Sequence, residues 1–305
     1  MAPRWFLIIY RNSECEFVQR RISCADRSPR CASRRRSVRW SRSCARRERD
    51  AAGHHGDRGH RHRRGRLERE AQATARLVHP NIVTVFDFGA VGAEGAFIVM
   101  ELVPGRSLRA ELHQRVRVAP PDAAVWFEQI CAGVATAHAH RVIHRDLKPE
   151  NVLITRGAAG GDVAKVLDFG LAKLRPDDAD ETFELTNPGV VMGTAGYMSP
   201  EQLRGDDVDE RGDIFALGIM VAEAIVGKRP FAGRTHSELL LAITNDPLTL
   251  DGKGSEVWRL EAVLQCATAE DPSARYRSVA EFARDVIPAL RAVPPSVGSG
   301  NMMVT

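Results

Sequence analysis

The strongest constraint on this chain is an octet, His144-Arg145-Asp146-Leu147-Lys148-Pro149-Glu150-Asn151, followed 17 residues later by Asp168-Phe169-Gly170. Phosphoryl transfer from ATP needs a carboxylate to accept a hydroxyl proton, oxygen ligands for Mg²⁺, and a cation near the γ-phosphate. The octet and the second aspartate together supply all three. An isolated Asp-Phe-Gly is a weak signal, because strands that end in exposed turns often show it, but the octet at this distance favours a metal-assisted site.

The pattern of hydrophobic residues predicts a few strands followed by many helices. A helix at 67–77 precedes strands at 82–88 and 96–103, which are predicted to form a hairpin. A long helix is predicted to be capped by Asp122 and to bury Val125 on its core-facing side. Beyond it the patterns predict short strands at 152–154 and 163–167, and helices at 213–226, 237–243, 256–266 and 279–290. This order favours an α+β protein with unequal lobes.

Because of the octet and Asp168, residues from about 67 to 292 resemble a protein kinase domain of the bacterial Ser/Thr type. The resemblance implies a two-lobed α+β fold with an incomplete small β lobe at 67–103 and a mainly helical large lobe at 104–292. It also implies transfer of the γ-phosphoryl group of ATP, with Mg²⁺ as cofactor, to Ser or Thr hydroxyls of protein substrates.

The family's catalytic roles carry over to matching positions. Asp146 is the expected catalytic base, and Lys148 is expected to neutralise charge on the transferring phosphoryl group. Asn151 and Asp168 are the expected Mg²⁺ ligands. Lys148, two residues after the base, together with the Gly-Thr pair that ends at Thr194, is similar to the Ser/Thr branch rather than the Tyr branch of the family.

Three further positions match structural residues of the family. Glu201 is expected to pair with Arg275, and Asp213 is expected to open the buried helix that supports the catalytic loop. The string Met198-Ser199-Pro200-Glu201 stands where the family has Ala-Pro-Glu, which departs in form but leaves the assignment intact.

The resemblance also implies a nucleotide site. Backbone groups of Glu101 and Val103 are expected to bind adenine, with Met100 as gatekeeper and Leu153 beneath the ring. Glu70 matches the helix glutamate that pairs with an ATP-positioning lysine, although a lone helix glutamate is more often a solvated charge.

Arg145 implies an activation segment that is ordered by phosphorylation, because a phosphate beside its guanidinium would form charge-assisted hydrogen bonds. Thr182 and Thr186 are the available acceptors, and the sequence does not choose between them.

Two expected features are missing upstream. No Gly-x-Gly-x-x-Gly precedes Glu70, and the first lysine of the whole chain is Lys148. Residues 1–66 hold 19 arginines against 6 acidic residues, a local charge of +13 in a chain whose net charge is +4. With no sustained periodicity from Glu14 onward, this segment is expected to be disordered or non-native, and 293–305 a flexible tail.

Three hypotheses account for this beginning. A frameshift upstream of Leu67 could have replaced the glycine loop and lysine strand, which the other two reading frames of the encoding DNA would reveal. Alternatively, the chain is a pseudokinase that acts as a protein-binding module, although the intact acid and metal set argues against it. Finally, an Arg-rich tail could bind nucleic acid, but without interleaved aromatic residues such binding would be non-specific.

Membrane and secretory classes are not favoured. The apolar run 214–226 is shorter than the ~20 residues that a bilayer crossing needs, and Gly218 and Glu223 interrupt it. Cys131 and Cys266 lie in helical patterns typical of buried free thiols. The expected setting is therefore cytoplasmic, with no membrane span.

Overall fold

The computed structural model describes residues 5–11, 14–16, 76–91, 95–169, 195–231, 233, 235–250 and 254–294. The chain divides into two compact units. One comprises Met1–Ala75 and Thr84–Leu102, and the other comprises Arg76–Val83 and Val103–Thr305. The predicted helix at 67–77, apart from Arg76 and Leu77, which are not helical, and most of the predicted N-terminal segment lie outside the described residues, as does the predicted tail apart from Val293 and Pro294.

The first unit contains an antiparallel sheet with the strand order β2-β1-β4-β3. Its strands are β1 (Trp5–Arg11), β2 (Glu14–Glu16), β3 (Val85–Val91) and β4 (Gly95–Glu101). The predicted hairpin is confirmed, since β3 pairs with β4 from Val85↔Met100 to Val91↔Gly95. The sequence did not predict the other two strands, and β1 pairs with β4 along its full length.

The hairpin begins three residues later than predicted because Ile82 and Val83 belong to the second unit. Ile82 forms a parallel bridge with Val166, and the Val83 amide donates to the Val166 carbonyl at 2.9 Å. Both side chains are buried. Burial against a strand of the second unit therefore takes these two residues out of the hairpin.

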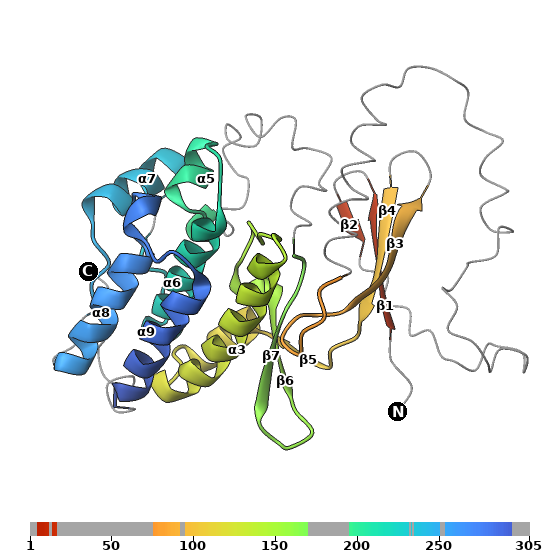
Figure 1. The fold of residues 1–305 in the computed structure, drawn as a ribbon, viewed down its shortest axis with the longest axis horizontal. Helices are drawn as coiled ribbons and strands as arrows, with labels where there is room; N and C mark the ends of the chain where they lie inside the picture. The colour runs from red at the N-terminus through yellow and green to blue at the C-terminus, as the bar shows by residue number, and fades with distance from the viewer. Residues whose placement is uncertain are drawn as a thin grey trace, which may run out of the picture. The chain divides into compact units, whose positions relative to one another are not determined.

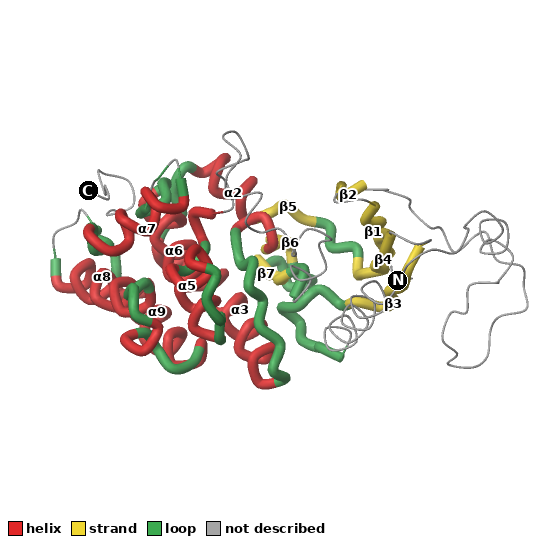
Figure 2. The backbone as a smooth tube through the Cα atoms, turned by 90° about the horizontal axis from the view of Figure 1, so that it is seen from above, coloured by secondary structure: helices red, strands yellow, loops and turns green. Residues whose placement is uncertain are grey.

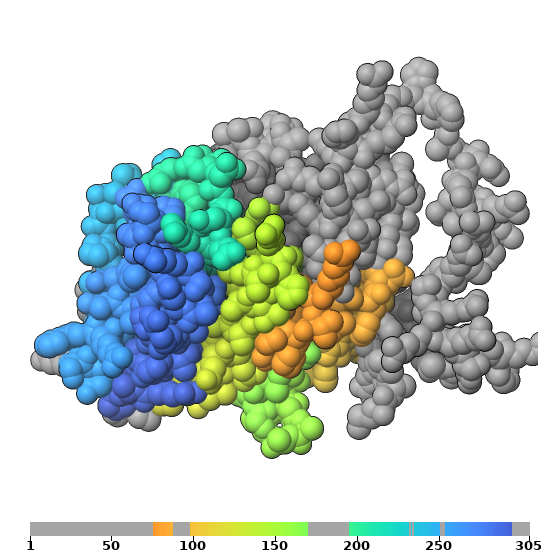
Figure 3. Space-filling view, viewed as in Figure 1, coloured from red at the N-terminus to blue at the C-terminus, as the bar shows by residue number. Residues whose placement is uncertain are grey.

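The second unit has a small sheet in the order β5-β6-β7, formed by β5 (Gly105–Ser107), β6 (Val152–Arg156) and β7 (Asp162–Val166). The two strands predicted at 152–154 and 163–167 are confirmed, and they pair with each other across a turn that contains Gly160. Gly160 takes a left-handed φ of 85°, which suits a residue without Cβ, and the turn projects from the surface (Figure 3).

Helices form the rest of the second unit (Figures 1 and 2). They are α2 (Leu108–Arg115), α3 (Pro120–Ala139), α5 (Pro200–Arg204), α6 (Glu210–Val226), α7 (His236–Asn245), α8 (Ser255–Ala267) and α9 (Val279–Ala292). Three 3₁₀ turns, η3 (Pro149–Asn151), η5 (Ala195–Tyr197) and η6 (Pro272–Ala274), complete the described elements. The helices predicted from 213 onward are confirmed with slightly wider bounds.

Two details of the long helix α3 were predicted wrongly. Pro120 and Pro121 start the helix, because their fixed φ suits its first turn, so Asp122 lies inside that turn rather than capping it. Val125 is 43% exposed, whereas Trp126, Phe127 and Ile130 are buried. The buried face of α3 therefore does not include Val125.

Helix α6 lies at the centre of the helical unit. Every residue from Gly212 to Val226 is buried, which is typical of a helix that is enclosed on all sides. It packs against α3, α8 and α9, and α3 and α9 lie side by side (Figure 1). The prediction that Asp213 opens this helix is wrong, because the helix begins at Glu210, and the Asp209 side chain accepts from the Arg211 amide at 2.8 Å. Among the described residues, no helix combines the length and apolar character that a bilayer crossing requires.

Candidate active site

The loop after α3 brings the central residues of the octet together. Lys148 Nζ lies 2.9 Å from Asp146 Oδ1 and 2.8 Å from Oδ2, and the lysine is only 9% exposed. The turn η3 folds the chain back, so that Asn151 Nδ2 donates to the Asp146 carbonyl at 2.7 Å and to Oδ2 at 3.3 Å. The Asp146 carboxylate is therefore held from two sides, while its side chain stays 21% exposed.

Asp168 follows the end of β7, and its neighbours tie it to the same loop. The Leu167 amide donates to the Asn151 carbonyl at 2.8 Å, and the Leu167 carbonyl lies 2.8 Å from His144 Nε2. The His144 and Phe169 rings contact each other at an interplanar angle of 60°, with centroids 4.8 Å apart. These contacts on either side of Asp168 place its backbone beside Asn151.

The predicted metal ligands fit a hard cation. Asn151 uses its amide nitrogen to donate to Asp146, which leaves its carbonyl oxygen as a donor for a cation. Asp168 adds carboxylate oxygens, and oxygen donors of these two kinds suit Mg²⁺. Within the described part of the chain there is no cluster of three or more His, Cys, Asp or Glu side chains. Mg²⁺ at phosphate sites commonly needs only one or two carboxylates, because the substrate phosphates complete its shell.

Asp213, on α6, holds the backbone of the loop that carries Asp146. It is 1% exposed, and it accepts from the His144 amide at 2.8 Å, the Arg145 amide at 2.9 Å and His138 Nε2 at 2.7 Å. Burial raises the pKa of Asp213, but the hydrogen bond from His138 and the interactions with His144 outweigh it and hold the pKa below its ordinary value. A buried carboxylate on α6 thus fixes the backbone just before Asp146.

The predicted pair of Glu201 and Arg275 is present and buried. Arg275 Nη1 and Nη2 donate to the two Glu201 oxygens at 2.7 and 2.8 Å. Its remaining three N–H groups donate to backbone carbonyls of Ala269, Arg211 and Glu270. Every donor of the guanidinium is therefore used, and this pair fastens α5 to the segment that follows α8.

A second, partly buried cluster was not predicted from the sequence. Arg109 on α2 donates from Nε to Glu150 at 2.8 Å and from Nη1 to Glu223 at 2.8 Å, and it also contacts the Tyr197 hydroxyl. Tyr197 in turn donates to Glu223. Burial lowers the pKa of Arg109, but its hydrogen bonds to Glu223 and Glu150 outweigh it and raise the pKa above its ordinary value. The cluster connects the octet, through Glu150, with η5 and α6.

The remaining predicted residues are those assigned to the nucleotide site and to the activation segment. Met100 is buried on β4 and Glu101 ends that strand, both in the first unit, while Val103 and Leu153 are half-buried residues of the second unit. The Glu101 amide donates to the Thr84 carbonyl at 2.9 Å. Arg145 precedes the candidate base, with a left-handed φ of 66°. Glu70, Thr182, Thr186 and Thr194 lie outside the described residues.

Comparisons with known proteins bear on the family of the chain. A family model described as a protein kinase domain matches residues 53–283. Serine/threonine-protein kinase PknB of Mycolicibacterium smegmatis is 37% identical over 227 residues, covering 73% of this chain and 35% of that protein. Serine/threonine-protein kinase PknD of Mycobacterium tuberculosis is 35% identical over 223 residues, covering 72% of this chain and 32% of that protein. The chain spans about a third of the length of these relatives.

Among solved structures, the crystal structure of a double mutant of the Mycobacterium tuberculosis PknI kinase domain is similar, with a TM-score of 0.54. The match covers 77% of this chain and 80% of that chain, at 23% sequence identity. At this identity the likeness supports the fold alone.

Proposed function

Because this chain belongs to the protein kinase family, we propose that it transfers the γ-phosphoryl group of MgATP to serine or threonine hydroxyls of protein substrates. The observation that carries the proposal is the Asp146 carboxylate, held by Lys148 and Asn151 and still partly exposed. The names of the relatives, serine/threonine-protein kinases of bacteria, support the same acceptor class.

In this proposal each residue of the loop has a separate task. Asp146 orients the acceptor hydroxyl and takes its proton, while Lys148 offsets negative charge on the phosphoryl group. Asn151 and Asp168 would hold Mg²⁺, which when bound would neutralise charge on the phosphates. Asp213 keeps the backbone of the loop in place through the transfer, so catalysis rests on positioning and electrostatics.

The nucleotide and regulatory roles belong to the same proposal. The family resemblance assigns adenine binding to backbone groups of Glu101 and Val103, with Met100 as gatekeeper and Leu153 beneath the ring, and it assigns Glu70 to the pairing with an ATP-positioning lysine. A phosphate on Thr182 or Thr186 would pair with Arg145, and Thr194 belongs to the segment that receives the substrate.

A cytoplasmic setting fits the free thiols of Cys131 and Cys266. Burial raises the pKa of Cys131 to about 12, which keeps this thiol protonated and unreactive.

A second candidate is a pseudokinase or truncated kinase that binds proteins with little ATP turnover. The absence of any lysine before Lys148 favours it, because kinases use a lysine on a strand of the small lobe to hold the α- and β-phosphates. Loss of the contact between this lysine and the phosphates is expected to lower the rate of phosphoryl transfer by orders of magnitude. The measurement must therefore distinguish weak turnover from none.

Two measurements on the full chain test the proposal. In the first, ATP is expected to raise the unfolding midpoint more in the presence of Mg²⁺ than in its absence, whereas AMP, which lacks the β- and γ-phosphates, is not. In Asp168→Asn the Mg²⁺-dependent part of the shift is expected to disappear. In the second, label from γ-labelled ATP is expected on serine or threonine of casein. No incorporation with the purified chain would favour the pseudokinase, and label on tyrosine would contradict the proposed acceptor.

A further inference from the structure

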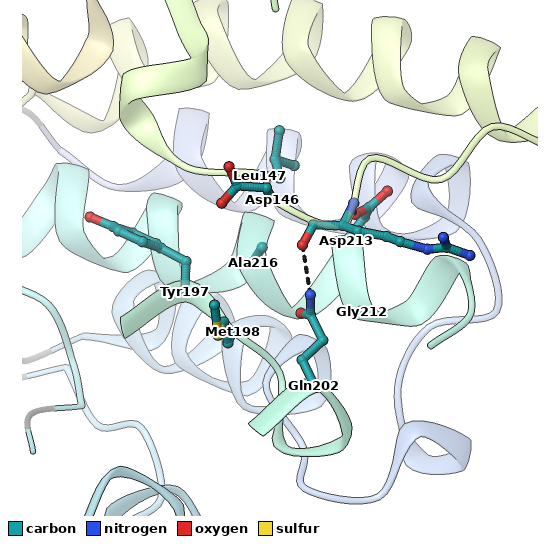
Figure 4. A pocket seen from close by; sticks show the side chains of 9 residues that line it. Asp146, Leu147, Tyr197, Met198, Gln202, Gly212, Asp213 and Ala216 are labelled. Atoms are coloured by element: carbon teal, nitrogen blue, oxygen red, sulfur yellow. Dashed lines mark hydrogen bonds between the residues drawn. The ribbon is translucent and has the colours of Figure 1, made fainter. Parts of the chain in front are cut away.

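Gln202, in the first turn of α5, makes contacts at both ends of its side-chain amide. Its Oε1 accepts from the Ser199 amide at 3.0 Å, and its Nε2 donates to the Arg145 carbonyl at 2.6 Å (Figure 4). The orientation of the amide follows from its partners, because a backbone N–H can only donate and a carbonyl can only accept. Gln202 therefore links the start of α5 to the loop that carries Asp146, although the two lie 57 residues apart.

The carbonyl that Gln202 binds belongs to the peptide group directly before the candidate base. Arg145 has a φ of 66°, in the left-handed region that non-glycine residues adopt only at a free-energy cost. Its amide donates to Asp213, and the following amide, that of Asp146, donates to His144 Nδ1 at 3.3 Å. The peptide group between Arg145 and Asp146 is thus held at its oxygen by Gln202 and at its nitrogen by His144.

The two ends of the Gln202 amide have separable tasks. The oxygen completes the capping box with Ser199, a task that glutamate performs equally well at this helix position. The nitrogen contributes nothing to the cap, and among the described residues its hydrogen-bond partner is the Arg145 carbonyl. The same side chain lines a small recess together with Asp146, Tyr197 and Met198 (Figure 4).

We propose that Gln202 is a positioning residue for Asp146, acting through the Arg145 carbonyl. Its amide nitrogen fixes the peptide plane that sets the direction of the Asp146 side chain. Because Gln202 also holds Ser199, the start of α5 and the catalytic loop move together. This inference rests on the proposed kinase function for its kinetic consequence, while the geometric link itself can be measured without turnover.

The test is Gln202→Glu in the full chain. The carboxylate keeps an acceptor for Ser199 but cannot donate to Arg145, and it sets a charged oxygen against the carbonyl. A misplacement of about 1 Å at a reacting group can lower a rate about 100-fold, so kcat at pH 7.5 is expected to fall roughly 10- to 100-fold. The KM for ATP is expected to change less than about twofold, because the residue does not touch nucleotide in this proposal.

A pH profile separates positioning from general damage. Below its pKa, the carboxyl group that Gln202→Glu introduces regains an O–H donor, so the ratio of wild-type to variant kcat is expected to shrink as the pH falls toward 5. Asp146, Asp213, Arg145 and Tyr197, the titratable groups that share the recess, are present in both proteins, so their titration affects both members of the ratio. A loss that is independent of pH would contradict the positioning role.

Gln265→Glu is the matched control. Gln265 Nε2 also donates to a backbone carbonyl, that of Leu248 at 2.8 Å, but far along the chain from the octet. It is expected to lower the unfolding midpoint by a similar amount and to leave kcat within about twofold of wild type. An equal loss of kcat in both variants, or none in Gln202→Glu, would overturn the inference.

Hydrogen exchange keeps the inference testable if the wild-type chain transfers no phosphate. In that case the proposed function fails on its own, and protection of the Asp146 amide becomes the measurement. Protection is expected to fall several-fold in Gln202→Glu and to stay unchanged in Gln265→Glu, because only the first loosens the peptide group before Asp146. Unchanged protection in Gln202→Glu would refute the link.

Discussion

Replacing Asp146 by asparagine is expected to lower the rate of phosphoryl transfer about 10²- to 10⁴-fold, the usual contribution of a positioned general base. Asparagine keeps an oxygen that can accept from Lys148 Nζ and from Asn151 Nδ2, but it cannot take the hydroxyl proton. The unfolding midpoint is therefore expected to change little. Label incorporation, measured beside thermal unfolding of the same preparation, checks both expectations.

The control for this variant is Asp162→Asn. Asp162 also lies in the second unit, but its carboxylate accepts from Trp126 Nε1 at 3.0 Å, at the start of β7. Removing its charge is expected to leave the transfer rate within about threefold of wild type. If Asp146→Asn retained the full rate, another group would have to accept the proton, or a contaminating kinase would be carrying the label.

Replacing Arg275 by methionine is expected to lower the free energy of unfolding by about 3–5 kcal/mol, the cost of removing one partner of a buried ion pair. The change leaves the Glu201 carboxylate buried without its two strongest donors. It also leaves the carbonyls of Ala269, Arg211 and Glu270 without their arginine donor. Denaturant unfolding at neutral pH measures the difference.

An exposed ion pair provides the comparison. Arg291 Nη2 lies 2.6 Å from Glu128 Oε2, with both side chains more than half exposed. Arg291→Met is expected to cost at most about 1 kcal/mol, because water screens such pairs. Equal losses in the two variants would mean that burial does not set the strength of the Glu201–Arg275 pair.

The loss in Arg275→Met should also depend on pH. Burial raises the pKa of Glu201, but its hydrogen bonds from Arg275 outweigh it and hold the pKa below the ordinary 4.5. A depressed folded-state pKa contributes stability above the unfolded-state value and loses it as the pH falls through the folded-state value. The difference between wild type and variant is therefore expected to stay constant above about pH 6 and to shrink below about pH 4.5.

The sequence predicted the parts of the site that are close together in the chain. Asp146, Lys148 and Asn151 lie within six residues of one another, so a single turn at Pro149 brings them together. The proline at this turn is part of the octet. Glu201 and Arg275 are 74 residues apart, and only the family resemblance paired them. The contacts of Gln202 and Arg109 were not predicted, because a glutamine in a first helical turn and an arginine on a short helix are typical of surface residues.

The errors have a similar origin. Local propensity chose Asp122 as a cap, although two prolines before it could start the helix earlier. Periodicity alone placed Val125 in the core, but the surface against which α3 packs decides which stripe is buried. The apolar run at residues 5–10 did not by itself predict a strand, because its pairing with β4 depends on a strand about ninety residues away.

The anchoring of the octet on α6 has a consequence for how activity can be lost. Asp213 lies on α6, in which every residue from Gly212 to Val226 is buried. The carboxylate that holds the catalytic loop therefore belongs to a helix that is packed on all sides. Local opening that reaches Asp213 would have to expose residues of α6 that the rest of the helical unit encloses. The anchor of the catalytic loop is therefore expected to be lost together with the packing of α6 and not before it.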